Sequence, residues 1–358
     1  MPIAVNARFL SQPITGTQRF AINISREIKK QRPDTVFLAP PIIKDQDLAD
    51  ELDAVIVGKH CYNRYTRLHL PASLLWEQID LPRWLKKHKH LPLLNLVNLA
   101  PLSYPDNCVT IHDLAFRLYP QYYSKKFSFF YNFAVPIIAR RAKRIVTVSH
   151  FSKQTIEEHL NIPASKITVA HNAIEIDRWR AYAIKPNPYP WPYILTVGSL
   201  DPRKNMARLI AAFNQINDRN LHLVIAGRES SKIFGKTSKI KENQVIFTGY
   251  LNDEKLANLY ANAVCLCYPS LYEGFGLPPL EAQALGCPVI VSNQTSLPEV
   301  FLESALYCNP NKVESIAEKL NEMTGDKSLR QKFVAAGYNN TKRFSWKRSA
   351  SLILDSMS

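Results

Sequence analysis

The sequence predicts an α/β protein built from two successive domains, each with a parallel sheet. Short apolar runs of strand length alternate with longer stretches of helical spacing, which is typical of strand–helix–strand units. The alternation starts afresh after residues 184–192, where IKPNPYPWP carries four prolines and is typical of an interdomain linker. A chain of 358 residues is also long enough for two domains that each bury a core.

The predicted strands follow one another at intervals that leave room for a helix between them. They span residues 2–7, 35–39, 54–57, 93–99, 109–112, 144–149 and 167–171 in the first domain, and 193–197, 221–226, 245–248, 264–268 and 288–291 in the second. We place the N-terminal domain at 1–184 and the C-terminal domain at 185–343. The last helical stretch, within 344–358, could pack on either domain.

The composition is ordinary for a soluble globular protein, but positive charge is in excess. Lysine and arginine exceed the acids by 15, and 25 of the 45 basic residues lie within 1–184. This excess favours a polyanionic partner such as nucleic acid, phospholipid headgroups or a diphosphate substrate. The absence of a leader sequence and of a run of about 18 apolar residues predicts a cytoplasmic protein. The six cysteines show no zinc-ligand spacing, so we expect free buried thiols and no metal site.

Residues 116–144 mix aromatic side chains with cations. Phenylalanine and tyrosine recur up to position 133, and lysines and arginines cluster at 125–126 and 140–144. Such a segment could lie on anionic lipid or on nucleic acid. The alternative is a buried aromatic helix with a solvated basic end, and the sequence leaves both open.

The stretch 268–300, YPSLYEGFGLPPLEAQALGCPVIVSNQTSLPEV, holds two glutamates around a glycine-rich turn. Glu273 precedes Gly-Phe-Gly, which ends at Gly276 and lets the backbone approach a ligand. The prolines at 278–279 suit the first turn of a helix, and we expect Glu281 in that turn, beside an end that attracts phosphate. Two carboxylates beside a phosphate site are expected to accept hydrogen bonds from ribose and sugar hydroxyls.

Three further positions lie where a predicted strand ends. The loop GSLDPRKN places Arg203 and Lys204 before a helix, where cations form an anion site able to hold a diphosphate and stabilise it as it leaves. Gly16 lies in a loop between a strand and a helix, and His112 ends the strand at 109–112. Because ligand sites of open α/β sheets collect at the carboxyl ends of strands, we expect these loops to serve one site.

Two motif likenesses are rejected. SSKIFGKT at 230–237 mimics a phosphate-binding P-loop, but a serine replaces its first glycine. Gly-Phe-Gly at 274–276 starts like a dinucleotide fingerprint, but Pro279 occupies the third glycine position. Neither a nucleotide triphosphatase nor a nicotinamide dehydrogenase is expected.

Together the motifs resemble the family 4 (group 1) retaining glycosyltransferases of the bacterial polysaccharide and O-antigen type. The resemblance is strongest at 194–300, in ILTVGSLDPRKN, VIFTGYL and the E-x7-E pair Glu273 and Glu281. It extends to NARFLSQPITGTQRFA, VTIHDLAF and VAHNAI in the first domain, although Ala173 stands where glycine is usual. It implies the GT-B fold, with two facing Rossmann-like domains, parallel sheets and an interdomain cleft.

The resemblance also implies which residues act. Those with a part in catalysis are His112, Arg203, Lys204 and Glu273. Those that bind the donor are Gly16, Tyr250, Leu251, Phe275, Gly276, Leu277 and Glu281. The two cations would hold the diphosphate, the first glutamate the transferred sugar and the second the ribose. The Tyr-Leu pair would lie beside the base, the histidine near the reacting carbon, and the loop at Gly16 over the diphosphate.

The implied reaction is a retaining, metal-independent transfer of a hexose from a nucleoside-diphosphate sugar, with mannose from GDP-mannose as the leading donor. Cations would stabilise the leaving diphosphate, as a metal does elsewhere, so no cofactor is expected. The acceptor would be a lipid-diphosphate-linked saccharide in O-antigen or capsule assembly. The enzyme would be peripheral on the inner face of the cytoplasmic membrane, with its basic N-terminal half on anionic lipid.

Two other activities remain open. A nucleotide-sugar epimerase of the same fold would isomerise the donor without an acceptor. A nucleic-acid-binding protein, suggested by the net charge of +15, would bind oligonucleotides with a steep salt dependence. The shared placement of the loops disfavours both, and we expect no nucleic-acid partner.

Overall fold

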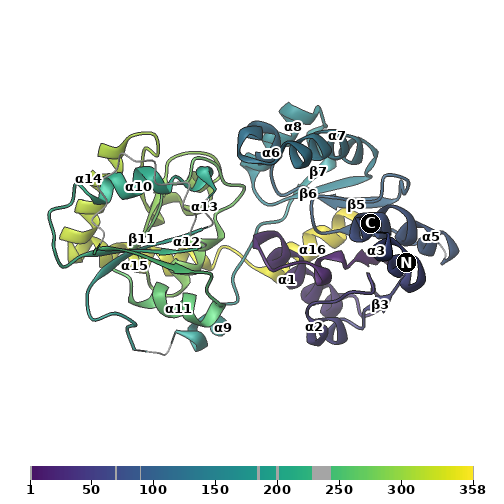
Figure 1. Cartoon of the computed structure of the whole chain (residues 1–358), viewed down its shortest axis with the longest axis horizontal. Helices are drawn as coiled ribbons and strands as arrows, with labels where there is room; N and C mark the ends of the chain where they lie inside the picture. Colours follow the sequence, from purple (N-terminus) through teal and green to yellow (C-terminus); the bar gives the residue numbers. More distant parts are fainter. Residues whose placement is uncertain are drawn as a thin grey trace. The chain divides into compact units, whose positions relative to one another are not determined.

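The structure is a computed structural model that describes residues 2–68, 71–88, 90–183, 186–198, 201–227 and 243–357. The chain divides into two compact units, each drawn in Figure 1. Unit 1 comprises residues 1–172 and 346–358, and unit 2 comprises 173–345. The division thus precedes position 184, where the sequence places the domain boundary, and residues 184 and 185 lie outside the described part.

Unit 1 contains a seven-stranded parallel sheet in the order β3-β2-β1-β4-β5-β6-β7. Its strands are β1 (Ala4–Asn6), β2 (Val36–Ala39), β3 (Val55–Ile56), β4 (Leu93–Asn95), β5 (Asn107–Thr110), β6 (Arg144–Thr147) and β7 (Ile167–Val169). The order reverses between β1 and β4, which are hydrogen-bonded neighbours. Ligands of doubly wound folds bind at the carboxyl side of such a switch point.

Helices cover the sheet of unit 1. They are α1 (Gly16–Gln31), α2 (Gln46–Glu51), α3 (Lys59–Arg67), α4 (Ala72–Leu75), α5 (Leu81–Lys87), α6 (Ala115–Leu118), α7 (Lys125–Arg141), α8 (His150–Leu160) and α16 (Trp346–Met357). Shorter turns are η1 (Arg8–Ser11), the π-helix η2 (Trp76–Asp80), η3 (Pro120–Tyr122) and η4 (Ala164–Lys166). Helix α1 buries Phe20, Ile24 and Ile28, which share one helical face at intervals of four residues.

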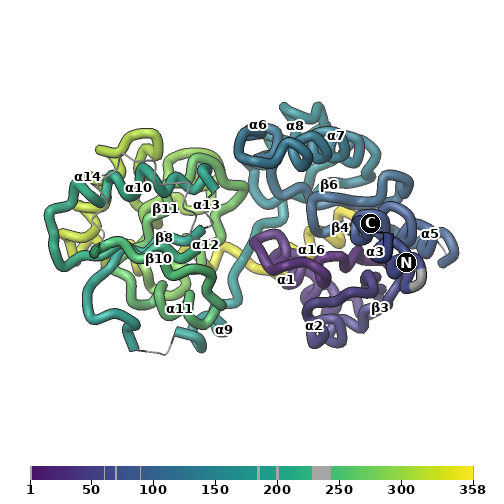
Figure 2. Tube along the Cα trace, viewed as in Figure 1, coloured from purple at the N-terminus to yellow at the C-terminus, as the bar shows by residue number. Residues whose placement is uncertain are grey.

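The C-terminal helix α16 packs on unit 1, a point that the sequence leaves open. Figure 2 shows this yellow segment among the purple and blue segments of the same unit. The side chain of Gln31 on α1 donates to the carbonyl of Lys347 over 3.1 Å, and the rings of Phe20 and Trp346 lie 5.9 Å apart. The helix is therefore held along α1 by both polar and aromatic contacts.

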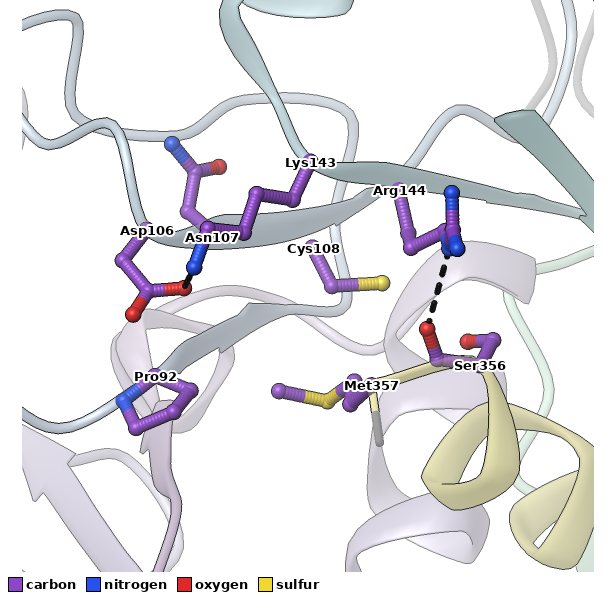
Figure 3. A pocket seen from close by; sticks show the side chains of 8 residues that line it. All are labelled: Pro92, Asp106, Asn107, Cys108, Lys143, Arg144, Ser356 and Met357. Carbon is purple, nitrogen blue, oxygen red and sulfur yellow. Dashed lines mark hydrogen bonds and ion pairs between the residues drawn. The ribbon is translucent and has the colours of Figure 1, made fainter.

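The far end of α16 lines a pocket of about 270 Å³ where β4, β5 and β6 begin (Figure 3). Arg144 donates from Nε to the carbonyl of Ser356 over 3.3 Å, and Lys143 pairs with Asp106 at 2.8 Å. A cation beside the last carbonyls of a helix is favourable, so Arg144 caps α16. Burial raises the pKa of the Cys108 thiol in this pocket to about 12, which leaves the thiol protonated and unreactive.

Unit 2 contains a six-stranded parallel sheet in the order β10-β9-β8-β11-β12-β13. Its strands are β8 (Tyr193–Val197), β9 (His222–Ala226), β10 (Val245–Gly249), β11 (Cys265–Tyr268), β12 (Val289–Ser292) and β13 (Leu306–Cys308). Its helices are α9 (Ile176–Tyr182), η5 (Pro202–Lys204), α10 (Met206–Phe213), α11 (Asp253–Asn262), α12 (Leu277–Ala284), α13 (Leu297–Phe301), η6 (Leu302–Ser304), α14 (Val313–Gly325) and α15 (Lys327–Thr341). Figure 1 shows α10 and α14 on one side of this sheet and α11 and α9 on the other.

The α/β class and the paired parallel sheets predicted from the sequence are confirmed. Each predicted strand overlaps an observed one, because most of these strands are covered on both faces and are therefore continuous apolar runs. Strand β13 was not predicted, since it is three residues long and only its last residue is fully buried. All six cysteines are free. The rejected motif at 230–237 lies outside the described residues, and within them no helix is long and apolar enough to cross a bilayer.

Candidate functional site

The switch point of unit 2 lies between β8 and β11, which pair in parallel with Ile194 opposite Cys265. The chain leaves β8 towards the turn η5 (Pro202–Lys204) and leaves β11 into residues 269–276, so the two predicted site loops both follow neighbouring strands at the carboxyl edge of the sheet. The backbone N–H of Leu271 donates to the carbonyl of Arg203 over 2.7 Å and joins the loops directly. Residues far apart in the sequence meet here because β8 and β11 are neighbours.

The side chain of Lys204 also joins the two loops. Its Nζ donates to Glu273 Oε1 over 2.6 Å and to the Tyr268 hydroxyl over 2.5 Å. The lysine side chain is 17% exposed and that of the glutamate 14%, so the pair is largely shielded from water. Burial disfavours the ammonium, but the adjacent carboxylate outweighs burial and the pKa of Lys204 is raised above its usual value. The site therefore holds a permanent cation. Sequence reasoning named both members of the pair but missed Tyr268, which closes an apolar strand and looks like a core residue.

The second predicted cation, Arg203, lies against Asp201. Its Nε donates to Asp201 Oδ2 over 2.9 Å, while the Asp201 side chain also accepts from the Arg203 backbone N–H over 3.0 Å. The carboxylate thus fixes the turn and compensates the guanidinium charge. Next along the chain, Asn205 has φ +61° and donates to the carbonyls of Pro269 and Pro310 over 3.0 and 2.6 Å. Asparagine tolerates the left-handed backbone region better than most residues do. The asparagine after Arg203 and Lys204 could therefore have indicated this turn, and sequence reasoning missed it.

The loop of Glu273 is held by residues after β12. The backbone N–H of Glu273 donates to Thr295 Oγ1 over 3.2 Å, and Ser296 Oγ donates to the backbone carbonyl of Glu273 over 2.9 Å. Gly276 has φ +98°, and a Cβ there would lie 2.6 Å from a methyl group of Leu297, so only glycine fits. Sequence reasoning assigned no role to 295–296. These contacts fix the backbone that the sequence expects to face the transferred sugar.

Helix α12 begins at Leu277 with both prolines in its first turn, as the sequence predicts. Glu281 lies one turn further in than expected: it falls in the second turn because the helix begins before Pro278. Its carboxylate is buried and accepts from the hydroxyl of Tyr260 over 3.0 Å. A carboxylate held in this way is oriented before any ligand arrives.

The other positions of unit 2 that are predicted to bind the donor differ in exposure. Tyr250 is 73% exposed and follows β10, the edge strand, with Leu251 half-buried beside it. Phe275 is buried and makes an edge-to-face contact with Phe344, with ring centroids 5.4 Å apart. An exposed aromatic at the sheet edge can stack on a flat ligand, whereas the ring of Phe275 is packed in the core.

In unit 1, His112 lies just beyond the end of β5. Its Nε2 donates to the carbonyl of Leu96 over 3.0 Å, its backbone N–H donates to Asn98 Oδ1 over 2.9 Å, and Phe20 packs edge-on against its ring. Burial lowers the pKa of His112 to about 4, against the weaker opposing effect of the Leu96 carbonyl. The ring is therefore neutral at neutral pH, with Nδ1 as an acceptor.

Gly16 is the first residue of α1 rather than part of a free loop. Thr15 is the N-cap residue, and Gly16 is exposed. The hydroxyl of Thr17 donates to Gln18 Oε1 over 3.0 Å, and Gln18 Nε2 donates to Gln12 Oε1 over 2.8 Å. A helix N-terminus with an exposed glycine leaves backbone N–H groups open to an anion.

A buried polar network occupies the switch point of unit 1, and sequence reasoning missed it. Glu77 in η2 is fully buried; it pairs with Arg8 Nη1 at 2.7 Å and accepts from Asn6 Nδ2 over 2.8 Å. Asn6 ends β1 and also donates to Asn95 Oδ1, at the end of the neighbouring β4, over 3.0 Å. The network braces the carboxyl edge of this sheet where the two strands meet.

Two family models cover most of the chain. Residues 14–178 match the model described as Glycosyltransferase Family 4, and residues 177–340 match that described as Glycosyl transferases group 1. The chain belongs to the family 4 (group 1) glycosyltransferases. This membership confirms the resemblance drawn from the sequence, and the two models meet close to the division between the two units.

Similar proteins include two O-antigen chain mannosyltransferases. The chain is 33% identical to O-antigen chain mannosyltransferase B of Escherichia coli over 66% of its length, and 29% identical to O-antigen chain mannosyltransferase RfbU of Salmonella typhimurium over 64%. The matches span 66% and 61% of those two proteins, so neither is matched along its full length.

Solved structures show the same fold. Anabaena Alr3699/HepE, solved in complex with UDP and glucose, superposes with a TM-score of 0.73 at 15% identity, covering 99% of this chain and 98% of that one. WaaG, a glycosyltransferase involved in lipopolysaccharide biosynthesis, gives 0.69 at 16% identity, covering 100% and 98%. These likenesses confirm the GT-B fold of this glycosyltransferase.

Proposed function

We propose that this glycosyltransferase moves mannose from GDP-mannose to a lipid-diphosphate-linked saccharide, with retention of configuration, in the assembly of a cell-surface polysaccharide. The observation that carries the proposal is the largely shielded Lys204–Glu273 pair at the carboxyl edge of the sheet of unit 2. A shielded cation is suited to stabilise a diphosphate that gains charge as it leaves. The similarity to two O-antigen mannosyltransferases supports the choice of mannose.

Each site residue takes one part in this proposal. Lys204 and Arg203 hold the diphosphate and make a metal unnecessary. Glu273 and the backbone at 275–277 hold the sugar, Glu281 the ribose, and Tyr250 with Leu251 the base. From unit 1, Gly16 serves the diphosphate, and neutral His112 serves the sugar as a hydrogen-bonding group rather than a general acid. The acceptor hydroxyl gives its proton to the leaving phosphate.

A nucleotide screen tests the proposal. GDP and GDP-mannose should raise the midpoint of thermal unfolding more than UDP, TDP, CDP and their sugars do, because a ligand stabilises the folded state by mass action. GDP-mannose with a synthetic polyprenyl-diphosphate disaccharide should then give a mannoside of the donor's anomeric configuration, with and without EDTA. The absence of any nucleotide response contradicts the proposal, and isomerisation of GDP-mannose without an acceptor identifies an epimerase instead.

We also propose that unit 1 docks on an anionic membrane surface through α7. Phe129 and Phe133 lie one turn apart on this helix and are 78% and 58% exposed, whereas Val135 and Ile138 are buried in the core. Lysines 125–126 and arginines 140–141 are exposed at its two ends. An apolar pair flanked by cations suits the headgroup region of an anionic bilayer better than water.

Replacing both exposed phenylalanines should weaken this docking. Phe129→Ser with Phe133→Ser is expected to lower binding to phosphatidylglycerol–phosphatidylethanolamine vesicles by about tenfold or more, since each ring loses apolar burial worth about 1.5 kcal/mol or more. Co-sedimentation measures it. Ile42→Ser is the matched control, because that side chain is 49% exposed in the same unit. Equal sedimentation of the double variant and the unaltered protein would rule out α7 as the docking surface.

A further inference from the structure

The ammonium of Lys204 is held by two side chains before any ligand arrives. Its Nζ lies 2.5 Å from the Tyr268 hydroxyl, 2.6 Å from Glu273 Oε1 and 4.9 Å from the centroid of the Tyr268 ring. The aliphatic part of the Lys204 side chain packs against Gly198, where an added Cβ would lie only 3.1 Å from Lys204 Cγ. A flexible four-carbon side chain is thus confined to one path.

An ammonium carries three N–H donors. Glu273 accepts one, and the Tyr268 hydroxyl oxygen accepts another. Among the described residues the third N–H has no acceptor. Because the ammonium nitrogen is tetrahedral, the first two hydrogen bonds fix the direction of this third N–H. Burial and, after it, the Glu273 carboxylate raise the pKa of Tyr268, so the phenol stays neutral and does not compete for the charge of the lysine.

We propose that Tyr268 is a positioning residue that aims the third N–H of Lys204 at the diphosphate of the donor. The inference rests on the proposed function, because it takes a nucleoside diphosphate as the ligand of Lys204. Tyr268 ends β11 and is fully buried, so it acts on the ligand only through the lysine. Without its hydroxyl, the ammonium keeps its charge and its bond to Glu273 but is free to turn away from the phosphate.

The test compares a diphosphate with a monophosphate of the same nucleoside. Calorimetry gives the affinity for GDP and for GMP, and the ratio of the two measures what the second phosphate contributes to binding. In Tyr268→Phe this ratio is expected to fall by about tenfold, the order of one hydrogen bond to a charged group, while GMP affinity stays unchanged. With GDP-mannose, kcat should fall more than KM rises, because the leaving diphosphate gains charge in the transition state.

Tyr193→Phe is the matched control. That tyrosine is also fully buried, on neighbouring β8, and its hydroxyl donates to the carbonyl of Leu259 over 2.8 Å. The Tyr193→Phe variant loses a tyrosine hydroxyl from the same sheet and leaves the contacts of Lys204 unchanged. Thermal unfolding of both variants verifies that they fold. A merely structural role for Tyr268 predicts that both variants change stability and neither changes the ratio.

The outcomes separate this inference from the proposed function. If the unaltered protein prefers GDP to GMP and Tyr268→Phe keeps that preference, the positioning role is overturned and the function stands. If the unaltered protein binds neither GDP nor UDP, the proposed function fails and this inference fails with it. A loss of the preference in Tyr268→Phe alone supports both.

Discussion

Replacing Lys204 with methionine is expected to lower the rate of sugar transfer about 10²- to 10³-fold, the cost of losing one preorganised group that stabilises transition-state charge. Methionine keeps the apolar stem and removes only the ammonium. Arg203 does not replace the lost ammonium, because its own guanidinium is held in a different position by Asp201. Steady-state transfer from GDP-mannose measures the loss, which should appear mainly in kcat.

The same substitution should also destabilise unit 2. The Glu273 carboxylate, 14% exposed, would lose the cation that compensates its burial. Adding Glu273→Gln removes that uncompensated charge, so the double variant should regain thermal stability while transfer stays low. This separates loss of chemistry from loss of fold.

Lys319→Met provides the control. Lys319 pairs with Glu318 and Glu322 at 2.9 Å each on α14 of the same unit, and one of these carboxylates is largely exposed. A surface pair of this kind is worth at most about 1 kcal/mol, so neither stability nor transfer should change much. If Lys204→Met transferred mannose as fast as Lys319→Met, the lysine would have no part in the chemistry.

Lys204 and Glu273 show how much of the site can be predicted from the sequence. Both residues were predicted as site residues, because each follows an apolar strand within a loop rich in glycine or proline. Their direct contact could not be predicted, since it depends on β8 and β11 being neighbours across a crossover of more than 60 residues. Local patterns locate the loops, and the sheet order decides which loops meet.

The network at Glu77 shows where sequence reasoning fails. The residue lies between Trp76 and Gln78 in a stretch of helical spacing, where a glutamate is usually solvated. The π-helix η2 changes the helical period there and buries Trp76, Glu77 and Asp80. Its partners, Arg8 and Asn6, lie about 70 residues earlier in the chain. No periodicity of the sequence shows that such distant polar residues share one buried site.

Replacing Glu77 with glutamine is expected to lower the free energy of unfolding of unit 1 by about 3–5 kcal/mol, the usual result of breaking a buried ion pair from one side. Glutamine keeps the shape of the glutamate side chain and can still accept the hydrogen bond from Asn6, but it removes the negative charge that compensates Arg8. That guanidinium is itself buried, and its Nε already has no acceptor within the described residues. Urea unfolding, with amide hydrogen exchange at β1 and β4, measures the change within unit 1.

Two further variants show whether the charge causes this effect. Glu51→Gln breaks the exposed pair that Arg26 makes with Glu51 at 2.9 Å in the same unit, and should change stability by less than about 1 kcal/mol. Arg8→Met added to Glu77→Gln removes the stranded cation and should restore much of the lost stability, because an apolar replacement of both partners avoids their desolvation. If Glu77→Gln unfolded like Glu51→Gln, the buried pair would contribute nothing beyond a surface contact. If instead Arg8→Met restored nothing, the loss would come from the packing of η2 and not from its charge.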